Sequence, residues 1–393
     1  MFTGLSKNVV ILSLTLIIVS LGFGMVIPVF PFLITDLGGG GTELGLLVAV
    51  AAFTELVFGP LWGGVSDRIG RKPVLALGLF GYAVSLVLFG LSTEMWMLLL
   101  FRALSGILTS AASASAMAYI GDSIPQKERG GGMGILGAAG GLGLILGPGF
   151  GGVLATISLA TPFFVGAAIA FATVPLVLFF LPESLTAEGR AKEKERPQSG
   201  IRRMISEALH SPIGILLFLA FLASFGLANF EAVFGLYALE KFHFGPEQVG
   251  TILTVIGLVS TLGKIFTGAL TLRWGDSAVI KTSLLAGSAG FLVLLAANSY
   301  PTILLATGFF ILSKTFLRPS VLSLTSRRTA LGQGITMGLS NSSMSLGRIV
   351  GPLWAGFTFD LDFNYPYLSG AFILFIGFLV SLARLAGASQ PDS

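Results

Sequence analysis

Long apolar stretches, repeated along the whole chain, constrain this sequence more than any other feature. A helix needs about 20 apolar residues to cross the hydrocarbon of a bilayer, which is about 30 Å thick. Twelve such stretches can be marked: residues 9–34, 43–66, 73–92, 95–120, 131–157, 161–181, 212–239, 247–271, 279–298, 301–324, 332–358 and 365–386. Because no water satisfies the backbone inside a bilayer, spans of this length must be helices. The sequence therefore predicts an all-α integral membrane protein with twelve transmembrane helices.

Composition agrees with a chain whose solvent is the bilayer. Charged residues make up 11% of the sequence, whereas soluble domains carry about 25%. The chain has no Cys and two His, which excludes disulfides and thiol chemistry and makes a His-rich metal site unexpected. The basic residues lie in short loops and form no patch, so we expect no nucleic acid as a partner. We expect a monomer in the lipid bilayer, with no cofactor and no metal.

Lys and Arg set the orientation of the spans. If residues at the ends of spans are counted with the adjoining loops, seventeen of the 23 fall on one side of the bilayer, five fall inside spans, and only Lys241 lies on the other side. Loops rich in Lys and Arg stay in the cytoplasm, so both termini are expected there. The apolar run 9–34 is too long for a signal-peptide core and is expected to remain as the first span. We therefore predict a multi-pass protein of the cell inner (plasma) membrane.

The chain reads as two related halves. "SLGF" at 20–23 returns as "SFGL" at 224–227, and "GLILGPGFGG" at 143–152 returns as "GRIVGPLWAG" at 347–356, both with an offset of 204 residues. A constant offset indicates duplication, with parallel repeats about an axis along the membrane normal. Folds of this kind hold the substrate between the halves and expose it to each side alternately.

One long polar segment separates the two halves. It covers residues 182–211, and its "GIRRMISEALH" portion has the pattern of an amphipathic surface helix. The predicted domains are thus an N-terminal six-helix bundle over 1–181, a cytoplasmic linker over 182–211 and a C-terminal six-helix bundle over 212–393.

Four motifs carry a resemblance to a known family. They are "LGFGMVIPVFP" at 21–31, "GGVSDRIGRK" at 63–72, "RALSG" at 102–106 and "GLILGPGFGG" at 143–152. In this order they resemble the signatures of spans 1, 2–3, 4 and 5 in the major facilitator superfamily, within its twelve-span drug:proton antiporter group of multidrug and tetracycline exporters. The resemblance covers the whole chain and implies the major facilitator fold, with two six-helix pseudo-repeat bundles. It also implies a proton-coupled exporter of amphipathic small molecules or drugs.

Charged side chains inside the spans are the first candidates for the transport mechanism, because charge in hydrocarbon is costly and usually functional. Away from the ends of the spans there are only two of the nineteen acids, Glu231 and Glu55. Burial disfavours the charged form of a carboxylate, so Glu231 can load a proton outside and release it inside, in competition with a cationic substrate. The resemblance supports this role, since related multidrug exporters carry an acid at this place in span 7. The alternative is a fixed ion pair of Glu231 with Lys264 or Lys314.

Glu55 and Arg102 are the other candidates for proton coupling. Glu55 lies near the middle of the second span, where it can serve as a second proton site, a substrate contact or the partner of a base. Arg102 stays protonated and cannot carry the proton itself. It can stabilise a neighbouring carboxylate in one conformation only, or act as a static hydrogen-bonding anchor.

The spans hold more bases than acids, which widens the range of possible substrates. The multidrug exporters that this chain resembles have an acid three residues before the Arg-Pro of span 10, whereas here Thr315 stands there, beside Lys314. An amphipathic anion, a zwitterion or a lipid-like solute is therefore an alternative to a cationic drug. Intramembrane charges and their neighbours form the predicted substrate cavity. These residues are Phe23, Phe30, Glu55, Asn229, Glu231, Phe234, Tyr237, Lys264, Lys314, Thr315, Arg318, Asn341 and Arg348.

Glycines of span 5 form the predicted helix 5 motif of antiporters. Gly143, Gly147 and Gly151 share one helix face because they are four residues apart, and Gly152 and the kinking Pro148 lie beside them. Small residues allow a second helix to approach closely. We interpret this face as a packing seam that also permits rocking and sealing.

The charged turn between spans 2 and 3 is the predicted cytoplasmic gate. Its members are Gly63, Asp67, Arg68, Gly70, Arg71 and Lys72. Positive charge alone serves topology, yet the second half has Leu272 in place of Asp67. The resemblance implies that Asp67 meets the cytoplasmic ends of second-half helices and locks the outward-facing state.

Other functions have less support in the sequence. "GMGILG" at 132–137 fits a dinucleotide fingerprint, but it opens a membrane span instead of following a strand. A membrane-embedded enzyme has little support, because the sequence contains no H-E-x-x-H pair, no Cys and no convincing pair of acids. Duplicated halves with isolated buried Glu fit alternating access better than a channel. We therefore expect a transporter and no enzyme.

Overall fold

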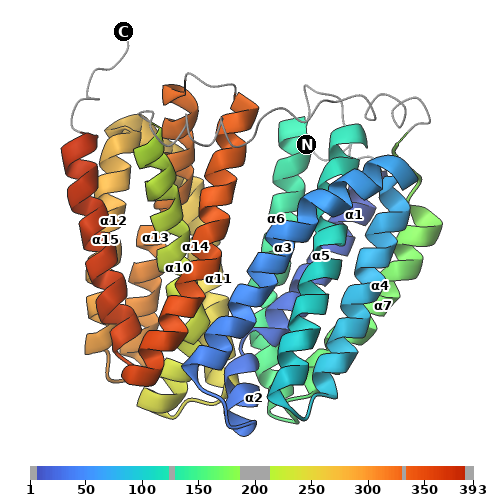
Figure 1. The fold of residues 1–393 in the computed structure, drawn as a ribbon, viewed down its shortest axis with the longest axis horizontal. Coiled ribbons are helices and arrows are strands. Elements are labelled where there is room, and N and C mark those ends of the chain that lie inside the picture. Colours follow the sequence, from blue (N-terminus) through green and yellow to red (C-terminus); the bar gives the residue numbers. More distant parts are fainter. Residues whose placement is uncertain (1–6, 124–128, 186–212, 330–332, 386–393) are drawn as a thin grey trace. The chain divides into compact units, whose positions relative to one another are not determined.

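The computed structural model describes residues 7–123, 129–185, 213–329 and 333–385, which form thirteen helices and no strand (Figure 1). The helices before residue 186 are α1 Lys7–Val26, α2 Phe30–Asp36, α3 Gly41–Ile69, α4 Arg71–Gly90, α5 Met95–Ser123, α6 Arg129–Ala155 and α7 Thr161–Phe180. Those after residue 212 are α10 Gly214–Phe242, α11 Pro246–Trp274, α12 Asp276–Ala296, α13 Tyr300–Arg328, α14 Gln333–Leu361 and α15 Tyr365–Arg384. The predicted all-α fold is confirmed. The predicted amphipathic linker helix lies outside the described residues.

The membrane spans follow the predicted stretches with two differences. Eleven segments of the described chain are long and apolar enough to cross a membrane. The helix that falls short is α14, which carries Asn341, Arg348 and Asp360 and is nevertheless 29 residues long. The first span is broken: α1 ends at Val26 and α2 begins at Phe30. Proline causes the break, since "IPVFP" places Pro28 and Pro31 where each removes a backbone N–H donor.

The described chain forms two compact units that repeat one packing plan. In the first unit α1 packs on α6, and α4 packs on α5 and α7. In the second unit α10 packs on α14, and α12 packs on α13 and α15. Each helix pair of the second unit corresponds to a pair of the first unit that lies six spans earlier in the chain, as duplication requires.

The units exchange two short segments. Residues 40–49, the start of α3, cluster with the second unit, and residues 244–254, the start of α11, cluster with the first. These segments correspond under an offset of about 205 residues, so the exchange is itself repeated. Periodicity along the sequence gave no sign of it, because hydropathy does not record which bundle a helix end contacts.

The predicted glycine face of α6 packs directly on α1. A Cβ added at Gly143 would lie 2.4 Å from the carbonyl oxygen of Ile17, and one at Gly151 would lie 2.0 Å from that of Met25. Real Cβ atoms do not approach a carbonyl this closely, so each position requires glycine. The stripe is therefore a seam of backbone contact between α1 and α6, as small residues allow.

The same seam recurs between α10 and α14. A Cβ at Gly347 would lie 2.5 Å from the carbonyl oxygen of Phe221, and one at Gly351 would lie 2.8 Å from that of Phe225. Gly347 and Phe221 stand 204 residues after Gly143 and Ile17. Both partners of the contact keep the offset found in the sequence, so the duplication extends to individual backbone contacts.

Candidate functional site: intramembrane charges and a charged turn

Glu231 occupies an exceptional position on α10. This helix is the most enclosed of the spans, and between Phe218 and Glu240 Glu231 is its only exposed residue. On either side Phe230 and Ala232 are buried. The carboxylate therefore leaves the packed bundle at the middle of a helix that is otherwise covered. Arg348 of α14 lies within electrostatic range of it.

Arg102 is the centre of a second charged group, in the first unit. The side chain extends from α5 and is 8% exposed. Its guanidinium carbon lies 5.1 Å from the ring centroid of Phe30 and 5.7 Å from that of Phe23. Such contacts attract a cation to the aromatic faces. Tyr82 and Glu55 lie within electrostatic range of Arg102, and Glu55 is exposed.

The five intramembrane bases divide into exposed and buried side chains. Lys264, Arg318 and Arg348 are exposed in the second unit, as is Asn341. Arg318 and Arg348 lie within electrostatic range of each other. Because Arg348 also lies within electrostatic range of Glu231, a substrate at this group would meet both signs of charge.

Lys314 lies inside the second unit. It is 6% exposed, and its Nζ has no hydrogen-bond partner within the described part of the chain. A Cβ added at Gly226 of α10 would lie 2.7 Å from this Nζ, and one at Gly287 of α12 would lie 3.2 Å from Cδ. These two glycines make the space that the side chain fills. An ion pair of Lys314 with Glu231 is therefore absent from this structure.

Lys314→Met should raise the thermal stability of the protein. A buried amine without a partner loses its hydration and gains nothing in return, whereas Met fills a similar space without a polar atom. We expect the melting temperature of the purified protein to rise by about 1–3 °C, which corresponds to roughly 1–2 kcal/mol in a chain of this size. Lys264→Met, at an exposed position, should leave it unchanged. A fall in melting temperature for Lys314→Met would show that the amine has a stabilising partner.

Several predicted cavity residues are enclosed by the second bundle. Asn229, Phe234 and Tyr237 are each at most 1% exposed. The Asn229 amide nitrogen donates to the carbonyl oxygen of Pro366 at 2.9 Å, and Tyr237 stacks edge-on against Tyr367 at 4.6 Å. These residues pack the bundle in this structure, and their contact with substrate stays a prediction.

Thr315 also turns away from solvent. Its hydroxyl donates to the carbonyl oxygen of Ile311 at 2.8 Å, and it lies 3.4 Å from Ser260 Oγ on α11. In contrast, Phe23 of the first unit is 38% exposed, and Phe30 is buried under Arg102. Of the predicted aromatic cavity residues, Phe23 is therefore the one that a substrate can reach in this structure.

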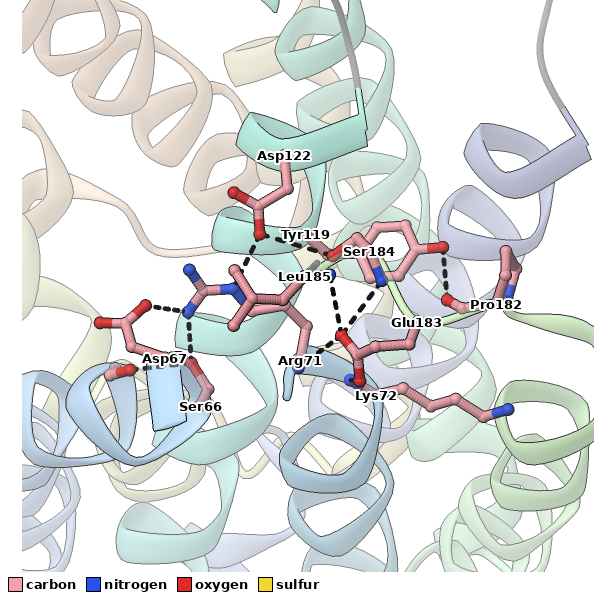
Figure 2. Close-up of polar contacts among 11 residues, drawn as sticks. Ser66, Asp67, Arg71, Lys72, Tyr119, Asp122, Pro182, Glu183, Ser184 and Leu185 are labelled. Carbon is pink, nitrogen blue, oxygen red and sulfur yellow. Dashed lines mark hydrogen bonds and ion pairs between the residues drawn. The ribbon is translucent and has the colours of Figure 1, made fainter. Parts of the chain in front are cut away.

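The charged turn between α3 and α4 forms a compact network around Arg71 (Figure 2). The guanidinium pairs with Asp67 one turn earlier, contacts Asp122 Oδ2 at 2.9 Å and donates to Ser66 Oγ at 2.7 Å. Gly70 makes the turn, with φ of 115°, a conformation that favours glycine. Gly63 lies one turn before Asp67 with open space around it. Of the predicted gate, Asp67 and Arg71 are thus joined directly.

Glu183 completes this network at the first residues of α4. It accepts from the backbone N–H of Arg71 at 2.9 Å and of Lys72 at 3.2 Å, and so satisfies donors at the start of the helix (Figure 2). Its Oε1 also accepts from the N–H groups of Ser184 and Leu185. Asp122 and Glu183 were missed in the sequence. Their positions at the ends of spans 4 and 6, on the side of Arg71, were the available signal.

Asp67→Asn should slow transport turnover without weakening substrate binding. The change removes the negative partner of Arg71 on α3, while Asp122 and Ser66 still hold the guanidinium. Maximal transport rate and substrate affinity should be measured separately, with a several-fold loss expected only in the rate. Arg68→Gln, at an exposed position in the same turn, is the control for altered loop charge. Equal turnover in Asp67→Asn and the parent would leave the turn with a topological role only.

Comparison with known proteins shows that this chain is similar to transporters. The family profile described as Major Facilitator Superfamily matches residues 12–237 and 216–392. "Multidrug resistance protein 2" of Bacillus subtilis is 32% identical over 374 residues, which cover 94% of each chain. "Quinolone resistance protein NorA" of Staphylococcus aureus is 28% identical over 381 residues and 96% of each chain. Both relatives match along nearly their whole length.

Solved structures agree on the fold. A bacterial homolog of the human lysosomal transporter Spinster, in an inward-facing and occupied conformation, superposes with a TM-score of 0.80 at 14% identity and covers 98% of each chain. The human organic anion transporter MFSD10 gives a TM-score of 0.65 at 23% identity, over 95% of this chain and 99% of that one. At these identities the likeness is one of fold.

Proposed function

Because the chain belongs to the Major Facilitator Superfamily, we propose that it is a proton-coupled secondary exporter of amphipathic small molecules. Its relatives that match end to end are named as multidrug and quinolone resistance proteins. Export by alternating access accounts for the duplicated bundles and for the glycine seams within each of them. The protein is a multi-pass membrane transporter. Cytoplasmic termini, a monomeric state and the absence of any enzymatic activity are part of the proposal.

The observation that best supports the proposal is the exposed position of Glu231 on an otherwise covered helix. A carboxylate that leaves a covered helix at mid-membrane can meet both a proton and a substrate. Its charged form is stabilised by a bound cation and is disfavoured in apolar surroundings. Proton and cationic substrate therefore exclude each other at one group, and a pH gradient then drives the substrate outward. No cofactor is required, since the proton is the coupling ion.

Arg102 and Glu55 provide a second group for coupling in the first unit. Arg102 remains charged in any conformation, and two aromatic rings face its guanidinium. Movement of Arg102 relative to Glu55 would change the positive charge that this carboxylate faces. We propose that this pair transmits the protonation state to the first bundle.

A second candidate function is export of organic anions or lipid-like solutes. The observation that favours it is the exposure of Lys264, Arg318 and Arg348 in the second unit, against one exposed mid-span acid, Glu231. Three bases can hold a carboxylate, sulfonate or phosphate group of an amphipathic substrate. The fold and the coupling scheme are the same for both candidates, and only the substrate differs.

Transport into everted vesicles separates the two candidates. Vesicles with an acidic interior should accumulate the exported substrate, and a protonophore should abolish the uptake. A cationic dye, an amphipathic organic anion and a fluorescent lysolipid should be compared in the same preparation. Uptake of the dye supports drug export, and uptake of only the anion or lysolipid supports the second candidate. Uptake of any of them that ignores both the pH gradient and the membrane potential would contradict proton coupling.

A further inference from the structure

The end of α14 is hydrogen-bonded to the beginning of α3. Asp360, the penultimate residue of α14, accepts from the backbone N–H of Gly41 through Oδ1 at 2.7 Å and from that of Thr42 through Oδ2 at 2.8 Å. The Thr42 hydroxyl donates to the same Oδ2. One carboxylate thus holds three donors of another helix. The two helices come from different halves of the sequence, although these ends lie in one compact unit.

These donors are the ones that a helix leaves unpaired. The first N–H groups of α3 have no acceptor within their own helix, and the positive end of the helix dipole favours a carboxylate there. Hydrogen bonds to a charged acceptor are about twice as strong as neutral ones. Asp360 is exposed, so water can replace it when the helices separate. The charged hydrogen bonds can therefore hold the two helix ends together, and the exposure of Asp360 to water allows them to break reversibly.

Backbone contact brings the two ends together. A Cβ at Gly356 of α14 would lie 2.2 Å from the carbonyl oxygen of Gly41, and one at Gly45 of α3 would lie 2.3 Å from that of Pro352. Neither position admits a side chain without movement. The glycines allow the close approach, and Asp360 adds directed bonds at its edge.

The repeat supplies an internal comparison, the approach of α6 to α11. There a Cβ at Gly250 would lie 2.3 Å from the carbonyl oxygen of Pro148, and one at Gly152 would lie 2.5 Å from that of Pro246. The backbone geometry is thus repeated. The neighbouring local bonds are repeated too, since Gly40 donates to Glu43 and Gly245 donates to Gln248, both at 2.8 Å.

The Asp360 carboxylate has no counterpart where α6 approaches α11. Thr156 stands 204 residues before Asp360, and its hydroxyl donates to Val153 of its own helix at 2.7 Å. Pro246 replaces Gly41 and has no N–H to offer. Glycine contact is therefore common to both approaches, whereas the charged contact belongs to one of them.

We propose that Asp360 is a one-sided latch that holds α3 to α14 and sets how easily this end of the transporter opens. The inference rests on the proposed alternating access, in which helices of the two halves part at one end of the membrane and then at the other. The latch lies at the start of α3, whereas Asp67 lies near its end, and 29 residues of helix separate the two ends by about 42 Å. Asp360 thus acts at the start of α3, and Asp67 acts near its end.

A cysteine-labelling experiment tests the latch directly. The chain has no Cys, so Ala49→Cys introduces a single reactive thiol on α3, one turn after Gly45, at a residue that is 3% exposed. Labelling of the purified protein by a maleimide should be slow in this parent. Asp360→Ala should accelerate it about tenfold, and Asp360→Asn, which keeps one oxygen but loses the charge, should accelerate it less.

Asp362 provides the matched control. It lies two residues further on and accepts from the backbone N–H of Asn364 at 2.8 Å, within its own loop, so Asp362→Ala should leave the labelling rate unchanged. Equal rates in the parent and in folded Asp360→Ala would overturn the latch, as would equal acceleration by Asp362→Ala. If Asp360→Ala does not fold, an unchanged rate in Asp360→Asn overturns it. The readout needs neither substrate nor pH gradient, so it can fail independently of the proposed function.

Discussion

Glu231→Gln should abolish transport driven by a pH gradient while the protein remains folded. Gln keeps the size and polarity of the side chain but cannot bind and release a proton near neutral pH. Because Glu231 is exposed on an otherwise covered stretch of α10, the substitution should disturb no packing. We expect uptake into everted vesicles to fall at least tenfold, with an unchanged melting temperature.

The competition between proton and substrate gives this variant a second readout. For a cationic substrate, lowering the pH should weaken binding to the parent, because protonation removes the negative charge that holds the cation. In Glu231→Gln the affinity should be low and independent of pH. Glu240→Gln is the matched control, since Glu240 is an exposed acid on the same helix, and it should behave as the parent does. Unchanged pH-driven transport in Glu231→Gln would exclude Glu231 as the proton site.

Gly151→Ala should destabilise the protein strongly. The new Cβ would lie 2.0 Å from the carbonyl oxygen of Met25, which is backbone and cannot rotate away. Helices α1 and α6 would have to separate along their seam, and overpacking of this kind costs about 1–3 kcal/mol or more. We expect a fall in melting temperature of several degrees and a lower yield of folded protein.

Gly141→Ala is the control on the same helix. Nothing lies within 4 Å of a Cβ at this position, and Ala favours a helix over Gly by about 1 kcal/mol. This variant should therefore be as stable as the parent or more so. Equal melting temperatures for Gly151→Ala and Gly141→Ala would contradict the seam.

The sequence predicted the elements and their duplication because both leave a signal along the chain. Apolar length marks the spans, and the 204-residue offset marks the duplication, which the paired seams at Gly143 and Gly347 then follow. The break in the first span is absent from the prediction, because hydropathy sets the limits of a span and does not register the prolines at positions 28 and 31.

The surroundings of single side chains were harder to predict. Helix α10 is apolar on every face, so its sequence has no amphipathic pattern to show which residues face the bundle interior. Nearness to Glu231 along the helix places Asn229, Phe234 and Tyr237 among the predicted cavity residues, whereas in the structure they pack in the core. Nothing in the sequence singles out Asp360, because its partners, Gly41 and Thr42, lie more than 300 residues away in the chain.

Proton movement driven by substrate alone tests the central claim most directly. Proteoliposomes with the same pH and no potential across the membrane should be loaded with a transported substrate and diluted, while the internal pH is followed. The account predicts that outflow of the substrate moves protons inward, that a protonophore dissipates the change, and that Glu231→Gln abolishes it. Substrate outflow with no movement of protons in the parent protein would contradict proton-coupled export.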